Sequence, residues 1–431
     1  MYGANTKKDF FTIAEVADIL GVSKETLRRW ETSGKLVPDR DGDNNYRLYT
    51  RDQIESFEQV QQLFDSNWDS EFLTKPLSDY SIVELFAGAG GLALGMEKAG
   101  FKSVLLNELD QHACKTLKEN RPSWNVVQGD ISKISFTHLK GQVDVLSGGF
   151  PCQAFSYAGK KLGFEDTRGT LFFEFARAVK EIQPKVILAE NVRGLLKHDN
   201  GKTLETIKSI IDELGYEILG CKLLKAVFYQ VPQKRERLFI VAVRKELISD
   251  VDFSWPSPYK RIMNLSDALK AGELYPEDVP LSNGQKYPAR KAEIMAMVPP
   301  GGYWRDLPYD VQVEYMKGSL HLGGGKTGMA RRLSWNEPSL TLTCAPAQKQ
   351  TERCHPDDTR PLTVREYARI QTFPDQWVFS GPITAQYKQI GNAVPVNLAY
   401  AVGRSIIRML NAIELPTRKK LSDLDEISNV A

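Results

Sequence analysis

A cysteine in a proline turn is the residue of this chain that is best suited to chemistry. Cys152 stands in the segment Gly-Gly-Phe-Pro-Cys-Gln-Ala-Phe-Ser (residues 148–156), which follows the apolar run 143–146. The five cysteines of the chain have the spacing of neither a disulfide framework nor a zinc knuckle. A strand that leads into a tight turn can hold a thiol at the mouth of a sheet. Cys152 is therefore either a nucleophile or an ordinary buried thiol.

Other polar residues also follow short apolar runs, each of which predicts a strand. A glycine cluster follows residues 81–86, and Glu108, Asp130 and Glu190 each follow a later run. The alternation of such runs with helical segments predicts an α/β domain with a doubly wound parallel sheet. Ligands of such sheets bind outside the carboxyl ends of the strands, so we expect these residues to meet there.

The glycine cluster and the two carboxylates after it are suited to a nucleoside. Gly88, Gly90 and Gly91 would let the backbone pass close to a ligand. Glu108 could accept from the two ribose hydroxyls, and Asp130 could accept from an adenine amino group. No basic group that would cradle a phosphate is evident, which favours a nucleoside-bearing cofactor without pyrophosphate. The G-x-G-x-x-G pattern is incomplete, so a glycine turn without a ligand remains the alternative.

A second glycine-rich segment, Gly-Gly-Gly-Lys-Thr at residues 323–327, has some likeness to a phosphate-binding loop. Such a loop requires glycine at position 320, where this chain has Leu320. The sequence therefore excludes a nucleoside-triphosphatase of that type.

The first 64 residues contain the start and stop signals of three short helices. Thr12 and Glu15 form a capping box for a helix that ends at Gly21, and a second helix is expected between Ser23 and Gly34. A polar turn and a strand-like segment precede a third expected helix, which Thr50 and Gln53 would cap and which ends near residue 64. Two helices joined by so short a turn indicate a helix-turn-helix. Residues 9–64 resemble the winged helix-turn-helix of the mercury-resistance regulator (MerR) class.

In that arrangement the second helix would enter a major groove of DNA. Lys24, Arg28 and Arg29 lie along this helix, and Arg47 follows the polar turn, so these four residues are expected to contact DNA. The alternative is a small docking module whose basic residues form a solvated face.

The composition is that of a globular protein with two or three domains. Of the 431 residues 42% are hydrophobic and 26% charged, and the formal net charge is +2. A polyanion would therefore be held by local basic patches and not by a global field. The chain lacks an N-terminal signal and an apolar run of about 18 residues. These features predict a cytoplasmic protein, associated with the nucleoid if it binds DNA.

Eight segments in a fixed order carry a further resemblance. They are residues 82–91, 107–108, 129–130, 150–153 (Phe-Pro-Cys-Gln), 189–192 (Ala-Glu-Asn-Val), 231–237, 365–369 and 389–395. Together they resemble the ordered motifs of DNA cytosine-5 methyltransferases, over residues 81–245 and 330–408. Any one of the motifs is weak, but the set in this order is highly specific.

The resemblance implies a domain plan and a cofactor. The expected parts are the helix-turn-helix (1–64), a linker (65–80), a Rossmann-like catalytic domain (81–245 and 351–410), an irregular target-recognition domain (246–350) and a polar tail (411–431). The implied cofactor is S-adenosylmethionine. Its expected contacts are Phe86, Gly88, Gly90, Gly91, Glu108, Leu109, Asp130, Ile131, Pro151, Asn392 and Ala393. For Asn392 a role in helix capping is the alternative.

The resemblance also implies a covalent reaction at cytosine. Carbon 5 of cytosine is a poor nucleophile until a thiolate, here Cys152, adds to carbon 6. Glu190 would stabilise the charge that develops at ring nitrogen 3. Arg235 and Arg237 alternate along a predicted strand, so both would aim at the same site. This chemistry requires a cytosine that is flipped out of the duplex. For Glu190 and both arginines, a structural ion pair is the alternative.

The expected partner is double-stranded DNA at a specific methylation site. Gln153, Ser156, Arg331 and Arg332 are the expected DNA contacts of the catalytic and target-recognition domains. The protein is expected to act there as a monomer, in a restriction-modification system whose endonuclease is a genetic and not a physical partner. The helix-turn-helix lies outside the family's motifs. It predicts a second, operator-type DNA site, a role in transcription and a route to dimers.

Two other functions fit parts of the pattern. A branch of the same family methylates transfer RNA, although the large lobe at 246–350 and the winged helix favour DNA. The chain could also be a transcription regulator with an inactive methyltransferase fold, against which the intact Pro-Cys and Glu-Asn-Val segments argue. No His or Cys residues have the spacing of a metal site, so no metal is expected.

Overall fold

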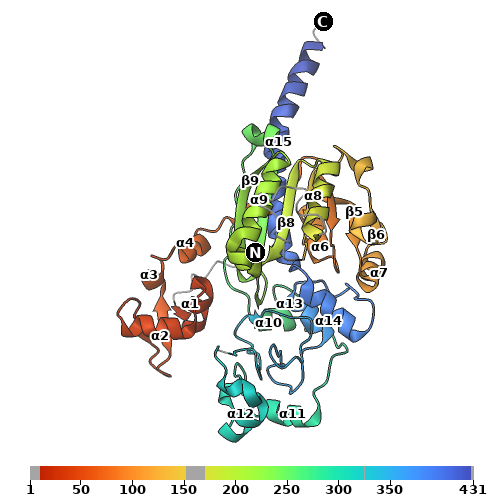
Figure 1. Ribbon diagram of the computed structural model, residues 1–431. Helices are drawn as coiled ribbons and strands as arrows, with labels where there is room; N and C mark the ends of the chain where they lie inside the picture. Colours follow the sequence, from red (N-terminus) through yellow and green to blue (C-terminus); the bar gives the residue numbers. More distant parts are fainter. Residues whose placement is uncertain (1–9, 152–169, 325, 429–431) are drawn as a thin grey trace.

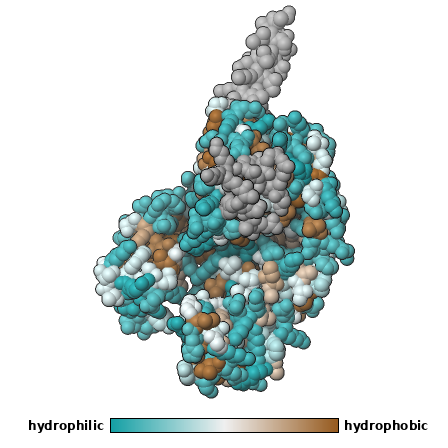
Figure 2. All heavy atoms as spheres, in the orientation of Figure 1, coloured by the Kyte–Doolittle hydropathy of each residue, from teal (hydrophilic) through white to brown (hydrophobic). Residues whose placement is uncertain are grey.

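The computed structural model describes residues 10–151, 170–324 and 326–428, with side chains to residue 415 except at residue 250. The N-terminal domain (red) lies beside the catalytic domain, and a smaller lobe (teal) lies below both in the view of Figure 1. Hydrophilic residues cover most of the described face in Figure 2. Within the described residues, no helix has the length and apolar character needed to cross a bilayer.

The N-terminal domain is a helix-turn-helix with a small antiparallel sheet. Its elements are β1 (Phe10–Thr12), α1 (Ile13–Leu20), α2 (Lys24–Thr32), β2 (Asp39–Arg40), β3 (Arg47–Thr50), α3 (Arg51–Ile54) and α4 (Glu58–Phe64). Thr12 and Glu15 cap α1 reciprocally, and Gly21 ends this helix in the left-handed conformation. At the start of α2 the Ser23 side chain accepts from the amide of Thr26. The first two expected helices are thus confirmed.

The third expected helix is interrupted and forms α3 and α4. The capping box of Thr50 and Gln53 begins α3 as expected, but this helix ends at Ile54. Phe57 is extended (φ −86°, ψ 128°), and its ring stacks on Trp30 of α2 with centroids 5.8 Å apart. The stacking contact with Trp30, a residue distant in the sequence, therefore outweighs the local helix propensity.

The catalytic domain is built on a seven-stranded, mostly parallel sheet. Its strands are β4 (Ser81–Leu85), β5 (Lys102–Glu108), β6 (Val126–Gln128), β7 (Val145–Gly148), β8 (Val186–Val192), β9 (Tyr216–Lys225) and β11 (Glu236–Arg244). Their order is β6-β5-β4-β7-β8-β11-β9, and β11 runs antiparallel to both of its neighbours. The chain order switches between β4 and β7, so the loops after these two strands diverge and open a crevice. The expected doubly wound fold is confirmed.

Helices bury both faces of this sheet (Figure 1). On one face lie α6 (Gly91–Ala99) and α15 (Val396–Ser428); on the other lie α8 (Leu171–Ile182) and α9 (Lys202–Glu213); α7 (Gln111–Asn120) packs beside β5 and β6. Strands that are covered on both sides are continuous apolar runs, which is why the sequence reveals them. The last helix, α15, continues through Ser428, so the residues expected to form a tail after 410 extend this helix.

The smaller lobe contains short helices and little regular sheet. Its helices are α10 (Leu265–Leu269), α11 (Ala289–Ala296) and α12 (Tyr309–Met316). A short parallel pairing of β10 (Gln233–Lys234) with β12 (Ser339–Leu340) joins it to the catalytic domain. Two further helices, α13 (Val364–Ile370) and α14 (Ile383–Asn392), lie between the lobe and the sheet in Figure 1. Thr363 and Glu366 form the capping box of α13.

The segment between the N-terminal and catalytic domains differs from the polar linker expected there. It contains a short helix, α5 (Trp68–Phe72), in which Trp68 is 4% exposed and meets the ring of Tyr259 edge-on. The carboxylate of Glu71 accepts from the amide and the hydroxyl of Ser257. These contacts, together with bonds of Asn411 on α15 to the backbone of Lys75 and Leu77, fix the segment to the catalytic domain. They join residues far apart in the sequence, so they do not stand out in a polar stretch.

Ion pairs also hold the N-terminal domain, close to the pairing of β10 with β12. Lys234 of β10 lies 2.7 Å from Asp18 of α1, and Lys24, the first residue of α2, is paired with Glu337. The side chains of Asp18 and Glu337 are 9% and 18% exposed, so these pairs are better shielded from water than ordinary surface pairs. The N-terminal domain is therefore docked on the rest of the protein.

Candidate active site

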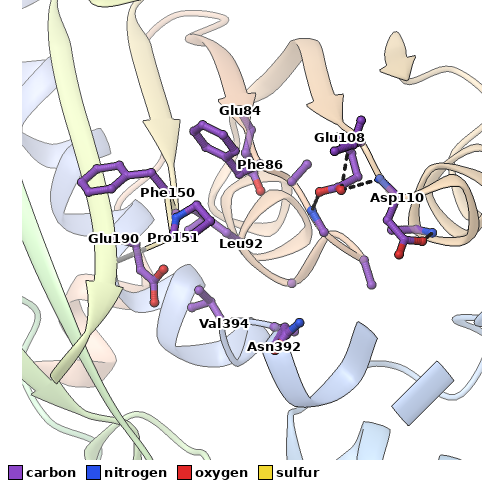
Figure 3. A pocket seen from close by; sticks show the side chains of 18 of the residues that line it. Glu84, Phe86, Leu92, Glu108, Asp110, Phe150, Pro151, Glu190, Asn392 and Val394 are labelled. Atoms are coloured by element: carbon purple, nitrogen blue, oxygen red, sulfur yellow. Dashed lines mark hydrogen bonds between the residues drawn. The ribbon is translucent and has the colours of Figure 1, made fainter. Parts of the chain in front are cut away.

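A cavity of about 530 Å³ opens at the carboxyl ends of the strands, beside the switch in strand order. Figure 3 shows Glu108 at one end of it, Pro151 and Glu190 at the other, and Asn392 and Val394 across from them. Its size falls in the range of small-molecule sites, about 300–1,000 Å³. The expected cofactor contacts that line it are Phe86, Gly88, Gly91, Glu108, Leu109, Asp130, Ile131, Pro151, Asn392 and Ala393. Gly90 does not line the cavity and is the N-cap of α6.

Gly91 permits the close approach of backbone that closes the cavity. A Cβ atom at this position would lie 2.2 Å from the carbonyl oxygen of Val394. Asn392, at the end of α14, and the residues after it can therefore lie across the start of α6. Cys344 is close by, with its Sγ 3.2 Å from the Asn392 Oδ1.

Backbone amides fix the carboxylate of Glu108 at the end of β5. It accepts from the amides of Gly88 (2.7 Å), Leu109 (2.8 Å) and Asp110 (2.8 Å), which leaves lone pairs on the side of the cavity. Asp130 accepts from the amide and hydroxyl of Ser132, and these bonds lower the pKa of Asp130. Both carboxylates are thus pre-oriented acceptors at the end of the cavity expected to hold a nucleoside.

At the other end of the cavity Glu190 and Arg237 form a buried ion pair. Arg237 Nε lies 2.7 Å from Glu190 Oε1, and each residue is 8% exposed. The adjacent strands β8 and β11 bring the two side chains together. Gly149 makes room for the carboxylate, because a Cβ there would lie 2.7 Å from Glu190 Oε2. Burial raises the pKa of Glu190 although the charge of Arg237 opposes this shift, so the site favours a carboxyl that can hold a proton.

Arg235 bonds to backbone carbonyl groups and not to this pair, in contrast to the expectation that both arginines aim at one site. Its guanidinium donates to the carbonyl oxygens of Leu342 (3.1 Å) and Gly391 (2.7 Å), and the residue is 2% exposed. It follows β10 and precedes β11, so the strict alternation of a single strand does not apply. Arg235 therefore ties the smaller lobe and the end of α14 to the sheet, while Arg237 meets Glu190.

The turn that leads to the expected nucleophile is fixed up to Pro151. The Asn191 side chain donates to the Phe150 carbonyl oxygen (2.9 Å), which fastens the turn after β7 to β8. Pro151 lines the cavity near Glu190 (Figure 3). Cys152 comes next in the sequence; Cys152, Gln153 and Ser156 lie outside the described residues.

The two arginines of the smaller lobe that were expected to read DNA are both largely enclosed. Arg332 is 4% exposed, and its guanidinium donates to the carbonyl oxygens of Met295 and of residues 355–358 and to the Thr359 hydroxyl. This placement does not fit base contact, because its donors are used to hold the lobe together. Burial lowers the pKa of the neighbouring Arg331.

The basic residues of the N-terminal domain fall into two groups. Lys24 is paired with Glu337, and Arg47 Nε lies 2.6 Å from Glu31 Oε2, an interaction that lowers the pKa of Glu31. Arg28 and Arg29 are exposed, with contacts only to Glu25 and Thr26 of their own helix among the described bonds. The second group remains accessible to a polyanion.

Sequence reasoning missed several residues that line the cavity. Lys388 of α14 lies 3.3 Å from Asp110, and both face the cavity beside Glu108. Glu84, on β4, also lines it and is 3% exposed. The available signal for Glu84 was a carboxylate inside an apolar strand, where burial is costly without a purpose. Among the described residues, no group of three or more His, Cys, Asp or Glu side chains could hold a metal ion.

Both the catalytic domain and the N-terminal domain match known protein families. Residues 80–408 match the family model "C-5 cytosine-specific DNA methylase", and residues 11–71 match "MerR HTH family regulatory protein". The chain is 70% identical over 410 residues to the Type II methyltransferase M.Eco47II of Escherichia coli, covering 95% of this chain and 98% of the relative. It is 63% identical over 402 residues to M.PspPI of Psychrobacter sp., covering 93% and 97%.

A solved structure supports the same assignment. The chain resembles the crystal structure of a "putative DNA modification methyltransferase" encoded within a prophage (E. coli), with a TM-score of 0.54 and 25% identity; the match covers 77% of this chain and 99% of the other. The family model spans most of the chain, and the matches confirm the resemblance carried by the eight motifs. The chain therefore belongs to the C-5 cytosine-specific DNA methylase family: it is a DNA cytosine-5 methyltransferase with a MerR-type helix-turn-helix domain at its N-terminus.

Proposed function

We propose that the protein transfers a methyl group from S-adenosylmethionine to carbon 5 of a cytosine flipped out of a specific duplex site. The observation that carries this proposal is the buried Glu190–Arg237 pair, which shares one cavity with Pro151 and with the Glu108 carboxylate. We further propose that it is the modification enzyme of a Type II restriction-modification system, as the names of its relatives suggest.

The residues of the cavity fit the proposed cofactor. Glu108 and Asp130 present oriented acceptors where a ribose and an adenine would lie, and Leu109 and Ile131 supply apolar contacts beside them. The close approach of Val394 to Gly91 leaves a slot of ligand size between α6 and the end of α14. When bound, S-adenosylmethionine would supply an electrophilic methyl group at the end of the cavity near Pro151.

The protein's own residues would activate cytosine in a series of steps that accounts for each bond and proton. The thiolate of Cys152 forms a bond to carbon 6, the pair of the 5,6 double bond becomes a 4,5 double bond, and the pair of the 3,4 double bond moves to nitrogen 3, which takes a proton from the Glu190 carboxyl. The resulting enamine makes carbon 5 nucleophilic enough to take the methyl group. Solvent water takes the proton from carbon 5, the thiolate leaves carbon 6 so that the 5,6 double bond and free Cys152 are restored, and nitrogen 3 returns its proton to Glu190. Arg237 would hold Glu190 in place throughout.

Methyl incorporation into duplex DNA and into transfer RNA tests this proposal. With labelled S-adenosylmethionine, we expect label in the 5-methylcytosine of duplex DNA and none in transfer RNA. Label only in transfer RNA would contradict the choice of substrate. The absence of label in both would contradict the proposed activity and favour a regulator with an inactive methyltransferase fold.

For the N-terminal domain we propose a second DNA-binding role that regulates transcription. It is supported by the match to MerR regulators and by the exposed Arg28 and Arg29 on α2. Deletion of the domain is a poor test, because α5 and the ion pairs of Lys24 and Lys234 join it to the rest of the protein. Substitution of exposed residues is a better test, because it leaves these contacts in place.

The double variant Arg28→Ala/Arg29→Ala is expected to lose binding to the upstream region of the protein's own gene while it methylates normally. Each lost phosphate contact lowers the slope of log K against log salt by about 0.9, so a drop of roughly two is expected in a gel-retardation series. Lys202→Ala/Lys208→Ala on α9 removes the same charge elsewhere and should change neither property. If the α2 variant retards this DNA as strongly as the parent does, or if the parent does not retard it, the proposal is wrong.

A further inference from the structure

Lys24 stands where a helix-turn-helix reads DNA, yet its side chain is engaged by another part of the same protein. It is the first residue of α2, and a recognition helix contacts base edges with its N-terminal residues. Its ammonium is held by Glu337, which lies in the smaller lobe just before β12. DNA and Glu337 would compete for the same cation. In this structure a carboxylate of the protein itself therefore takes the place of DNA at the start of α2.

Glu337 is the centre of a charge network that crosses the interface of the N-terminal domain. Its Oε2 lies 3.9 Å from Lys234 Nζ, which in turn lies 2.7 Å from Asp18 Oδ1 on α1. Burial opposes ionisation of its carboxyl, but the cations of Lys24, Lys234 and Arg331 outweigh burial and lower its pKa. One network thus holds both helices of the helix-turn-helix, on the side of the domain that faces the rest of the protein (Figure 1).

The interface has the composition of a contact that can open. Apart from the charges, two apolar side chains of the catalytic domain, Phe228 and Ile262, pack against the core of the N-terminal domain. Burial raises the pKa of Asp18 against the effect of Lys234, because removing this carboxylate from water offsets much of the attraction in the pair. Trp68 of α5 anchors the chain separately, so a released domain would stay tethered at the residues between α4 and α5.

We propose that this network is an autoinhibitory contact, and that α2 must leave the smaller lobe before it binds its operator. The inference rests on the operator-binding role proposed above. In the docked form Glu337 occupies Lys24 while Arg28 and Arg29 stay exposed, and release makes all three cations available to DNA. The apparent affinity for the operator is then the intrinsic affinity multiplied by the fraction of open molecules. The docking equilibrium thus sets how strongly the operator is occupied.

Reversing the charge of Lys234 separates this mechanism from simple electrostatics. The carboxylate introduced by Lys234→Glu repels Asp18 and Glu337 and should free the domain, so the operator should be bound at least about fivefold more tightly. An added negative charge that left docking unchanged would instead weaken DNA binding. The double variant Asp18→Lys/Lys234→Glu restores an ion pair of opposite polarity, and its affinity for the operator should return to that of the parent.

The matched control is Lys245→Glu, which reverses the charge in an exposed pair with Asp212 at the opposite end of β11 from Lys234. It should not tighten operator binding. Gel retardation of the duplex upstream of the protein's own gene compares the variants with the parent. If the parent retards this duplex and Lys234→Glu binds it equally or more weakly, the inference is overturned and the operator role stands. If the parent does not retard it, the operator role fails and the inference fails with it.

Cross-linking of the wild-type protein gives an answer even where Lys234→Glu does not fold. A carbodiimide joins a lysine amine to a carboxylate that it touches, so Lys24 and Glu337 should form an amide that peptide mass spectrometry detects. Saturation with the operator duplex should remove most of this link, whereas a duplex of equal length without the operator should leave it. The pair of Lys245 with Asp212 is the internal standard and should link equally in both samples. A yield of the Lys24–Glu337 link that the operator does not change would overturn the inference.

Discussion

Substituting serine for Cys152 is expected to lower kcat for DNA methylation by on the order of 10⁴-fold or more, the scale seen when a catalytic nucleophile is removed. A hydroxyl is far less ionised and less nucleophilic than a thiol at neutral pH, so carbon 6 would not be attacked. Labelled methyl incorporation under single-turnover conditions measures the step directly. A Cys152→Ser variant that methylates as well as the parent would end the covalent mechanism.

The control for this variant is Cys221→Ser. Cys221 lies on β9, away from the cavity lining, and burial raises the pKa of its thiol. This variant should methylate normally. A duplex that contains 5-fluorocytosine adds a second readout, because the carbon–fluorine bond cannot release a proton and the adduct persists. The wild type and Cys221→Ser should form a denaturation-resistant complex with it, and Cys152→Ser should not.

The second large effect is expected at the buried ion pair. Glu190→Gln keeps the shape of the side chain but removes the acid, and kcat should fall on the order of 10²–10³-fold through lost stabilisation of the ring charge. It also leaves the buried Arg237 without its counter-charge, which should lower the free energy of unfolding by roughly 3 kcal/mol. Single-turnover assays measure the loss of methylation activity, and denaturant unfolding measures the change in the free energy of unfolding.

The double variant Glu190→Gln/Arg237→Met distinguishes a catalytic pair from a structural one. Removing both charges should restore most of the stability, because no unpaired charge stays buried, while methylation remains lost. Recovery of activity together with stability would mean that the pair only holds the fold. Glu314→Gln, which breaks the exposed pair with Arg290, should change neither stability nor activity measurably.

Local and chemical signals in the sequence predicted much of this molecule. Capping boxes at Thr12 and Thr50 begin helices where expected, because the interactions that make them span only three residues. The strands that carry Glu108 and Glu190 were recognisable because both faces of the sheet are covered. The order of the motifs then identified the family.

Several expectations that differ from the structure depend on partners remote in sequence. Phe57 breaks the third expected helix because it stacks on Trp30. Lys24 meets Glu337, and Arg235 meets the Gly391 carbonyl, over distances along the chain at which no periodicity or motif carries information. Arg332 has the side chain of a base-reading residue, and only its enclosure by backbone carbonyls shows another use. Residue type alone cannot separate these roles.

The most direct test of the central claim is bisulfite sequencing of DNA from cells that express the protein. Bisulfite converts cytosine and spares 5-methylcytosine, so position, base and activity are read together. Wild-type protein should leave one cytosine unconverted at every copy of a short recurring duplex sequence, and Cys152→Ser should leave none. Complete conversion with the wild type, or the same protection with Cys152→Ser, would contradict this account.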